Sequence, residues 1–154
     1  MKIYFLRHAH ASWPDWPGPD RERPLTGEGR KQARRVSAFL KNIGAQPGAI
    51  VTSPLKRAAQ TAEIVAEDFG FPPDEDPLLG PGFDAKKLAR LLKKHPCREV
   101  MLVGHEPDFS DVISQLTGGR VEMAKAGLAC VGAGDADRDS RLLWLVTPKL
   151  LKSL

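Results

Sequence analysis

The feature that most limits the possible folds is the alternation of short apolar runs with longer amphipathic segments. Lys2–Leu6, Ala49–Thr52 and Glu99–Val103 have the length and the β-branched, aromatic or aliphatic content of buried strands. The last run is apolar almost without interruption, which is typical of a central strand in a parallel sheet. Strands that alternate with helices predict an α/β fold, a three-layer α/β/α sandwich whose sheet is mostly parallel.

Helices are predicted between these strands. Thr26 is the expected N-cap of a helix that runs to about Ile43, and Pro54 is expected at the first position of a helix that Gly70 ends. The remaining predicted elements are a short edge strand near Pro77–Leu79, helices over Ala85–Lys94 and from Pro107 to Gly118, strands over Leu128–Val131 and Arg141–Val146 with a polar turn between Gly134 and Ser140, and a docked helix over Pro148–Leu154. The last two strands are expected to add an antiparallel edge.

Length and composition exclude several classes of protein. The 154 residues predict one domain over 1–154, and 23 basic against 19 acidic residues give a net charge of +4 without a long block of like charge. We therefore expect no nucleic-acid partner, but an anionic substrate is favoured. Arg7 interrupts the first apolar run, and no segment approaches the ~20 apolar residues of a membrane span. Because Cys97 and Cys130 are far apart in the sequence, we expect a reduced, cytoplasmic protein. We also expect a monomer that does not associate with a membrane.

Basic side chains follow three of the predicted strands. Arg7 and His8 end the first strand, Arg57 lies one turn after the strand that ends at Thr52, and His105 follows the central strand. Taken alone, His105 would be a structural histidine and Arg57 a solvated helix residue. The carboxyl ends of parallel strands meet at one sheet edge, however, where α/β proteins place their ligands. Together these donors predict an anion-binding site.

Four sequence motifs, in the same order as in the family, resemble the histidine phosphatase superfamily, and in particular its short branch of SixA-type phosphohistidine phosphatases. They are Leu6–Ala11, Pro24–Ala33, Ser53–Ala62 and Val103–Pro107. The resemblance implies a phosphoglycerate mutase-like fold and a phosphoryl transfer that uses no cofactor and no metal. It also implies that His8 is the nucleophile and that Arg7, Arg57 and His105 are catalytic residues that bind the phosphoryl group. The substrate would be a phosphohistidine-bearing protein or a small phosphorylated compound.

The chemistry of the residues adds two expectations. His8 must be neutral at its attacking nitrogen, so its other nitrogen should donate to a fixed acceptor such as a backbone carbonyl. Bound phosphate should favour protonation of His105.

Ala9 stands where the family commonly has glycine, which is tolerable unless the position needs a positive φ. His10 is expected at the rim of the site or behind it.

The general acid is not identified by the sequence. Its candidates are Asp15, Asp20, Asp84 and Glu106. A phosphohistidine expels an imidazole, whose conjugate acid has a pKa near ~6.5, whereas an alkyl phosphate expels an alkoxide that needs a strong proton donor. A missing acid therefore favours an N–P bond or an activated ester as substrate.

Other interpretations remain open at this point. His8-Ala9-His10 also resembles the start of metal-dependent hydrolases, although those sites need further ligands and commonly a barrel of ~250 residues. A small-molecule phosphatase, a non-catalytic phosphate-binding module and a mutase are further alternatives. Trp13 and Trp16, in a proline-rich loop, either cap the core or wall the substrate mouth, where they could contact a partner protein.

Overall fold

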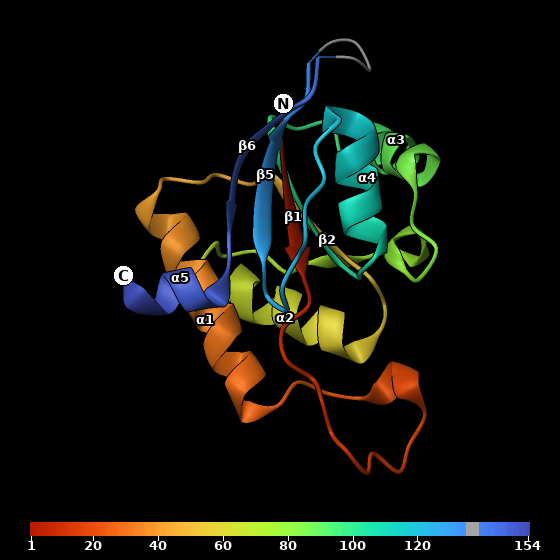
Figure 1. Ribbon diagram of the computed structural model, residues 1–154, viewed down its shortest axis with the longest axis vertical. Coiled ribbons are helices and arrows are strands. Elements are labelled where there is room, and N and C mark those ends of the chain that lie inside the picture. The colour runs from red at the N-terminus through yellow and green to blue at the C-terminus, as the bar shows by residue number, and fades with distance from the viewer. Residues whose placement is uncertain (135–138) are drawn as a thin grey trace.

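A six-stranded mixed sheet forms the middle layer of the molecule (Figure 1). The computed structural model describes residues 1–134 and 139–154. The strands are β1 (Lys2–Arg7), β2 (Ala49–Thr52), β3 (Asp74–Glu75), β4 (Glu99–Gly104), β5 (Leu128–Gly132) and β6 (Arg141–Val146). Their order across the sheet is β3-β2-β4-β1-β5-β6; the first four strands are parallel to one another, β5 is antiparallel to β1, and β6 is antiparallel to β5. The predicted parallel sheet with an antiparallel edge is therefore confirmed.

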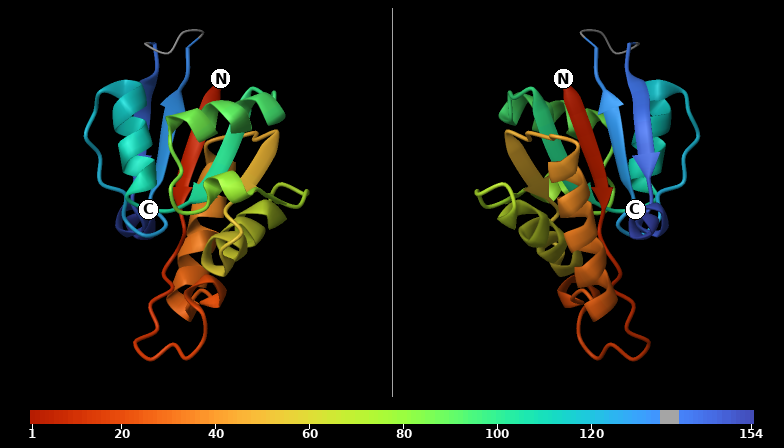
Figure 2. Two further views of the ribbon diagram at one scale, coloured as in Figure 1. Left: turned by 90° about the vertical axis from the view of Figure 1, so that its right-hand side faces the viewer. Right: turned by 90° about the vertical axis from the view of Figure 1, so that its left-hand side faces the viewer.

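Helices cover both faces of this sheet, as Figure 2 shows. The helices are α1 (Gly27–Asn42), α2 (Lys56–Glu67), α3 (Ala85–Lys94), α4 (Asp108–Thr117) and α5 (Pro148–Ser153). α1, α2 and α5 pack on one face around Val36, Leu40 and Leu151. α3 and α4 pack on the other face around Leu91 and Phe109. These two buried layers confirm the predicted three-layer α/β/α sandwich.

Most predicted elements lie where the sequence pattern placed them, and Thr26 is the N-cap of α1, accepting from the Gly29 N–H at 3.1 Å. Two boundaries were wrong. α2 begins at Lys56 rather than at Pro54, because the N–H of Leu55 donates to Ser53 Oγ and holds Ser53-Pro54 in a turn. The edge strand is Asp74–Glu75, and Pro77–Leu79 forms a 3-10 turn instead, with Asp76 accepting from Leu78 at its start.

The segments outside these elements matter for the site. A long loop follows β1 and contains one 3-10 turn, η1 (Asp20–Glu22). Figure 2 shows this loop projecting beyond the helices at the carboxyl end of β1. The predicted polar turn at Gly134–Ser140 lies largely outside the described residues. Within the described chain, none of the helices combines the length and the apolar character needed to cross a membrane.

Candidate active site

Three neighbouring strand ends bring the sequence-predicted residues to one edge of the sheet. β1 and β2 both pair with β4 in parallel, so Arg7 is aligned with Gly104. The His8 N–H continues this pairing by donating to the Gly104 carbonyl at 3.0 Å. The rings of His8 and His105 then lie side by side, with their centroids 5.4 Å apart. Parallel pairing of β1, β4 and β2 thus assembles a site from residues about a hundred positions apart.

His8 is buried and is held in one tautomer by its neighbour. Its Nδ1 lies 2.8 Å from the carbonyl oxygen of Ala9, so Nδ1–H donates and Nε2 carries the lone pair. Burial lowers the pKa of His8 from 6.5 to about 3; the charges of His105, Arg57 and Arg7 act in the same direction, and the Ala9 hydrogen bond opposes them. The ring is therefore neutral at pH 7, with a nucleophilic nitrogen.

His105 is positioned by a residue that sequence reasoning gave no role. Its Nε2 lies 2.8 Å from the hydroxyl of Ser53, which is fully buried at the end of β2. Because Nε2 is engaged, Nδ1 is the nitrogen of His105 that can contact a bound phosphoryl group. Burial, followed by the charge of Arg57, lowers the pKa of His105 to about 4. An anion placed between His105 and Arg57 would raise that pKa again.

The two arginines have different surroundings. Arg7 donates from Nη1 to the Met123 carbonyl at 2.8 Å, but its buried Nε has no hydrogen-bond partner among the described residues. A buried donor without a partner is costly, and a bound oxyanion would satisfy it. Arg57 is also buried, and its Nη1 lies 3.2 Å from Oδ2 of Asp20 and donates to the Asp20 carbonyl at 3.1 Å.

The residues after His8 tie this strand end to α1 and α2. The Ala9 N–H donates to Thr61 Oγ1 at 3.1 Å, and Ala9 does not need the positive φ that would favour glycine: Ala126 (φ 56°) is the one described non-glycine residue with a positive φ. His10 Nδ1 is bonded to Thr26 Oγ1 at 2.7 Å, and the His10 N–H donates to Gln32 at 2.9 Å. His10 therefore ties the segment after His8 to Thr26 and to Gln32 in α1.

The four candidate acids differ in what their carboxylates contact. Asp84 accepts from the N–H of Lys87 at the start of α3, and Glu106 accepts from the N–H of Ser110 at the start of α4. Asp15 is exposed in the loop after β1. Asp20 alone contacts a residue of the predicted pocket, and a hydrogen bond from Arg23 followed by the charge of Arg57 lowers the pKa of its carboxyl group. An ionised Asp20 cannot supply a proton.

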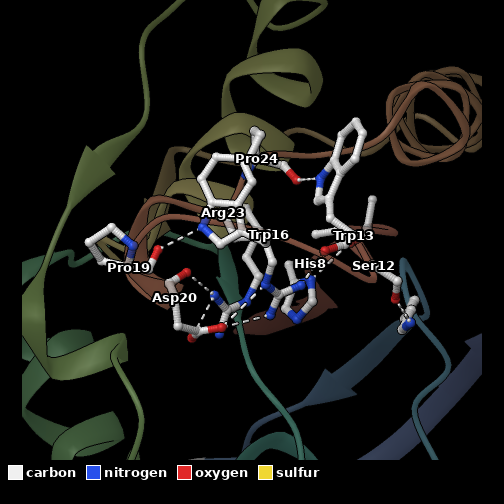
Figure 3. A network of polar contacts seen from close by, with 12 residues as sticks. His8, Ser12, Trp13, Trp16, Pro19, Asp20, Arg23 and Pro24 are labelled. Atoms are coloured by element: carbon white, nitrogen blue, oxygen red, sulfur yellow. Dashed lines mark hydrogen bonds and ion pairs between the residues drawn. The ribbon is translucent and has the colours of Figure 1, made fainter.

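The loop after β1 is held by its own polar contacts, which Figure 3 shows. The indole of Trp13 donates to the Pro24 carbonyl at 2.8 Å, and that of Trp16 donates to the Pro19 carbonyl at 3.0 Å. Trp13 is exposed, and neither ring belongs to the two buried clusters. Of the two expectations for these rings, a role in capping the core is therefore not supported.

The rings of the His8-Ala9-His10 motif are both engaged by protein oxygens, as described above. In the described part of the chain, no three histidine, cysteine, aspartate or glutamate side chains gather closely enough to share a metal ion. The arrangement consists instead of two neutral imidazoles and two guanidinium groups. Such a set can surround a phosphoryl group with positive charge and present one nitrogen to phosphorus.

Known proteins resemble this chain in sequence and in fold. The model of the histidine phosphatase superfamily (branch 1) matches residues 3–80. An uncharacterized protein of Picosynechococcus sp. is 32% identical, over 98% of this chain and 99% of that protein. The phosphohistidine phosphatase SixA of Escherichia coli is 24% identical, over 99% of this chain and 97% of SixA. A structure of the protein histidine phosphatase SixA complexed with tungstate has a TM-score of 0.87 at 23% identity, covering 98% of this chain and 99% of that chain. This chain belongs to the histidine phosphatase superfamily.

Proposed function

We propose that this protein is a metal-independent phosphatase that hydrolyses phosphohistidine on a partner protein, through a phosphohistidine intermediate on His8. The observation that carries the proposal is the hydrogen bond from Nδ1 of His8 to Ala9, because it leaves a neutral Nε2 at the edge where two arginines and a second histidine meet. Membership of the superfamily supports the phosphatase activity, and the SixA-like fold over the whole chain supports the substrate class.

In the first step, Nε2 of His8 attacks phosphorus, and the bond between phosphorus and the leaving nitrogen of the substrate breaks. Arg7 and Arg57 offset the charge that spreads over the three equatorial oxygens, and Arg7 Nε is a donor that no described protein group uses. His105 contributes a further donor through Nδ1, which the approaching phosphoryl charge helps to protonate. The substrate imidazole, protonated by solvent at its other nitrogen, leaves as a neutral ring.

In the second step, water attacks the phosphoryl group on His8. The bond between phosphorus and Nε2 breaks, one proton of the water passes to the site or to solvent, and orthophosphate leaves. The Ala9 carbonyl stabilises the Nδ1–H while His8 carries the phosphoryl group, since the phosphorylated ring has a partial positive charge. The same donors serve both steps, because both pass through a similar arrangement of equatorial oxygens.

The acids around the site favour an N–P bond in the substrate. Asp84 and Glu106 accept hydrogen bonds at helix N-termini, and Asp20 is ionised between arginines. An alkoxide leaving group would need a protonated acid at this edge, whereas an imidazole does not. A phosphorylated protein side chain also suits a site that is bordered by the largely exposed loop after β1. We therefore expect a protein partner, a preference for phosphohistidine over phosphoserine and no requirement for a metal ion.

The test uses one peptide sequence that is phosphorylated either on histidine or on serine, with phosphate release measured in excess EDTA. We expect a clearly higher kcat/KM for the phosphohistidine peptide and an acid-labile, alkali-stable phosphoryl group on the enzyme. His8→Ala should lose both, whereas His95→Ala, a histidine at the end of α3, should retain them. Equal or better hydrolysis of the phosphoserine peptide would indicate a phosphomonoesterase instead, and turnover by His8→Ala would refute the intermediate.

A further inference from the structure

The carboxylate of Asp20 bridges two arginines at the predicted phosphate site. Its Oδ1 accepts from Nε and Nη2 of Arg23, at 3.2 and 3.0 Å, and its Oδ2 lies 3.2 Å from Nη1 of Arg57. Figure 3 shows Asp20 and Arg23 pointing toward one another across these contacts. One internal anion thus uses both oxygens to hold two guanidinium groups, one of which is assigned above to the phosphoryl group.

Carboxylate and phosphoryl oxygens compete for the same guanidinium donors. The N–H groups of Arg57 Nη1 that point to Asp20 cannot point to a substrate oxygen at the same time. We propose that Asp20 occupies the position of a phosphoryl oxygen, that substrate displaces it, and that Arg23 then binds the phosphoryl group as a third arginine beside Arg7 and Arg57. The proposal rests on the function proposed above and adds to it a binding residue and a competing group.

The anchoring of the two side chains suits such an exchange. Asp20 is 68% exposed and belongs to η1, a turn without buried residues, so little besides the arginines holds its carboxylate. Arg23 is 23% exposed and also donates from Nη1 to the Ala11 carbonyl, in the segment that follows His8. The carboxylate can therefore move out to solvent while the Arg23 guanidinium stays bonded to the carbonyl of Ala11, three residues after His8.

The exchange has a consequence for selectivity. Exposed ion pairs such as those of Asp20 are weak, so a doubly charged phosphoryl group, with more oxygens, replaces the carboxylate readily. A singly charged anion gains less from the arginines and competes poorly. Asp20 would therefore lower the affinity for all anions, and would keep the arginines paired until a phosphoryl group arrives.

The first test measures the affinity of the whole protein for orthophosphate by calorimetry. Asp20→Asn keeps the size of the side chain and removes its charge, and should bind orthophosphate roughly 3- to 10-fold more tightly, the gain expected from losing one or two exposed ion pairs. Glu22→Gln is the matched control, since Glu22 is an exposed acid in the same turn. It should change the affinity by much less.

Arg23→Gln, made alone and in the Asp20→Asn background, tests the second half of the proposal. If Arg23 contacts phosphate directly, its loss should weaken binding in both backgrounds, whereas the exposed Arg21→Gln should not. If Arg23 acts only by holding Asp20, the substitution has no effect once Asp20 is Asn, and the assignment is overturned. Circular dichroism and thermal unfolding check that each variant is folded.

The outcomes also separate this proposal from the proposed function. Equal or weaker orthophosphate binding by Asp20→Asn, with normal binding by the wild type, would refute the displacement of Asp20 and leave the phosphatase assignment intact. It would mean that Asp20 positions Arg57 instead. If neither the wild type nor any variant binds orthophosphate, the phosphate site itself is refuted, and both proposals fail together.

Discussion

A single methyl group added at Gly29 tests how strictly the loop after His8 is positioned. Gly29 lies in the first turn of α1, and a Cβ at this residue would stand 2.1 Å from the carbonyl oxygen of His10. Ordinary contacts of a Cβ begin at 3.4 Å, and the obstacle is backbone, which cannot rotate away. In Gly29→Ala, α1 and the segment after β1 must therefore move apart by more than about 1 Å.

Two effects on stability oppose each other. Overpacking in a buried region costs about 1–3 kcal/mol, and alanine is favoured over glycine in a helix by up to about 1 kcal/mol. We expect a net loss on the order of 1 kcal/mol in the free energy of unfolding. The catalytic loss should be larger, because a shift of about 1 Å in reacting groups can lower the rate by about 10²-fold. His10 is only two residues from His8 and transmits the shift.

The assay compares kcat/KM and urea unfolding for Gly29→Ala and for Gly27→Ala. Gly27 lies in the same turn, and a Cβ there would meet nothing within 4 Å. Gly27→Ala should therefore keep normal activity and stability, or become slightly more stable. The reasoning is refuted if Gly29→Ala has the same kcat/KM and unfolding free energy as Gly27→Ala.

Three further predictions concern protonation, positioning and recognition. The pKa values of His8 and His105 are lowered from 6.5 to about 3 and about 4, so between pH 6.5 and 4 the unfolded chain takes up protons that the folded chain does not. The free energy of unfolding should then fall as the pH drops from 7 toward 4, and His105→Gln should flatten that dependence in urea titrations; an unchanged slope contradicts the lowered values. Ser53→Ala removes the partner of the buried Nε2 of His105, which should cost about 1–3 kcal/mol in stability and lower kcat/KM, as unfolding and steady-state assays would measure. Replacing Trp13 and Trp16 together with alanine should reduce kcat/KM more for a phosphorylated protein than for a small phosphorylated compound, and an equal loss for both would argue against a role in recognition.

The fold could be predicted largely because its signals are local. The apolar run Glu99–Val103 marks the central strand, and Thr26 marks the start of α1 by its side-chain cap. The misplaced start of α2 shows the limit of such rules. Proline suits the first position of a helix, but Ser53 Oγ captures the N–H of Leu55 and delays the helix by two residues.

The site could be predicted only as far as strand order determines it. Arg7, His8 and His105 converge because β1 and β4 are parallel neighbours. The partners of these side chains come from three-dimensional contacts that have no fixed spacing. The Ala9 acceptor, the Ser53 hydroxyl and the bridging carboxylate of Asp20 depend on how turns and loops close. Four acids were equal candidates on sequence grounds, and the structure separates them by what each carboxylate contacts.

The backbone at the end of β1 is held on both sides, since the Arg7 N–H donates to Gly127 and the His8 N–H to Gly104, each at 3.0 Å. The long segment between His8 and α1, by contrast, projects outward and is secured mostly by its own contacts. The end of β1, which carries the proposed nucleophile, is therefore fixed in the sheet, whereas the loop after it, which is expected to contact the partner, is held separately. A designer could exchange residues 12–19 for another loop, keep Asp20 and Arg23, and so redirect the protein to a different phosphorylated target without rebuilding the chemistry beneath it.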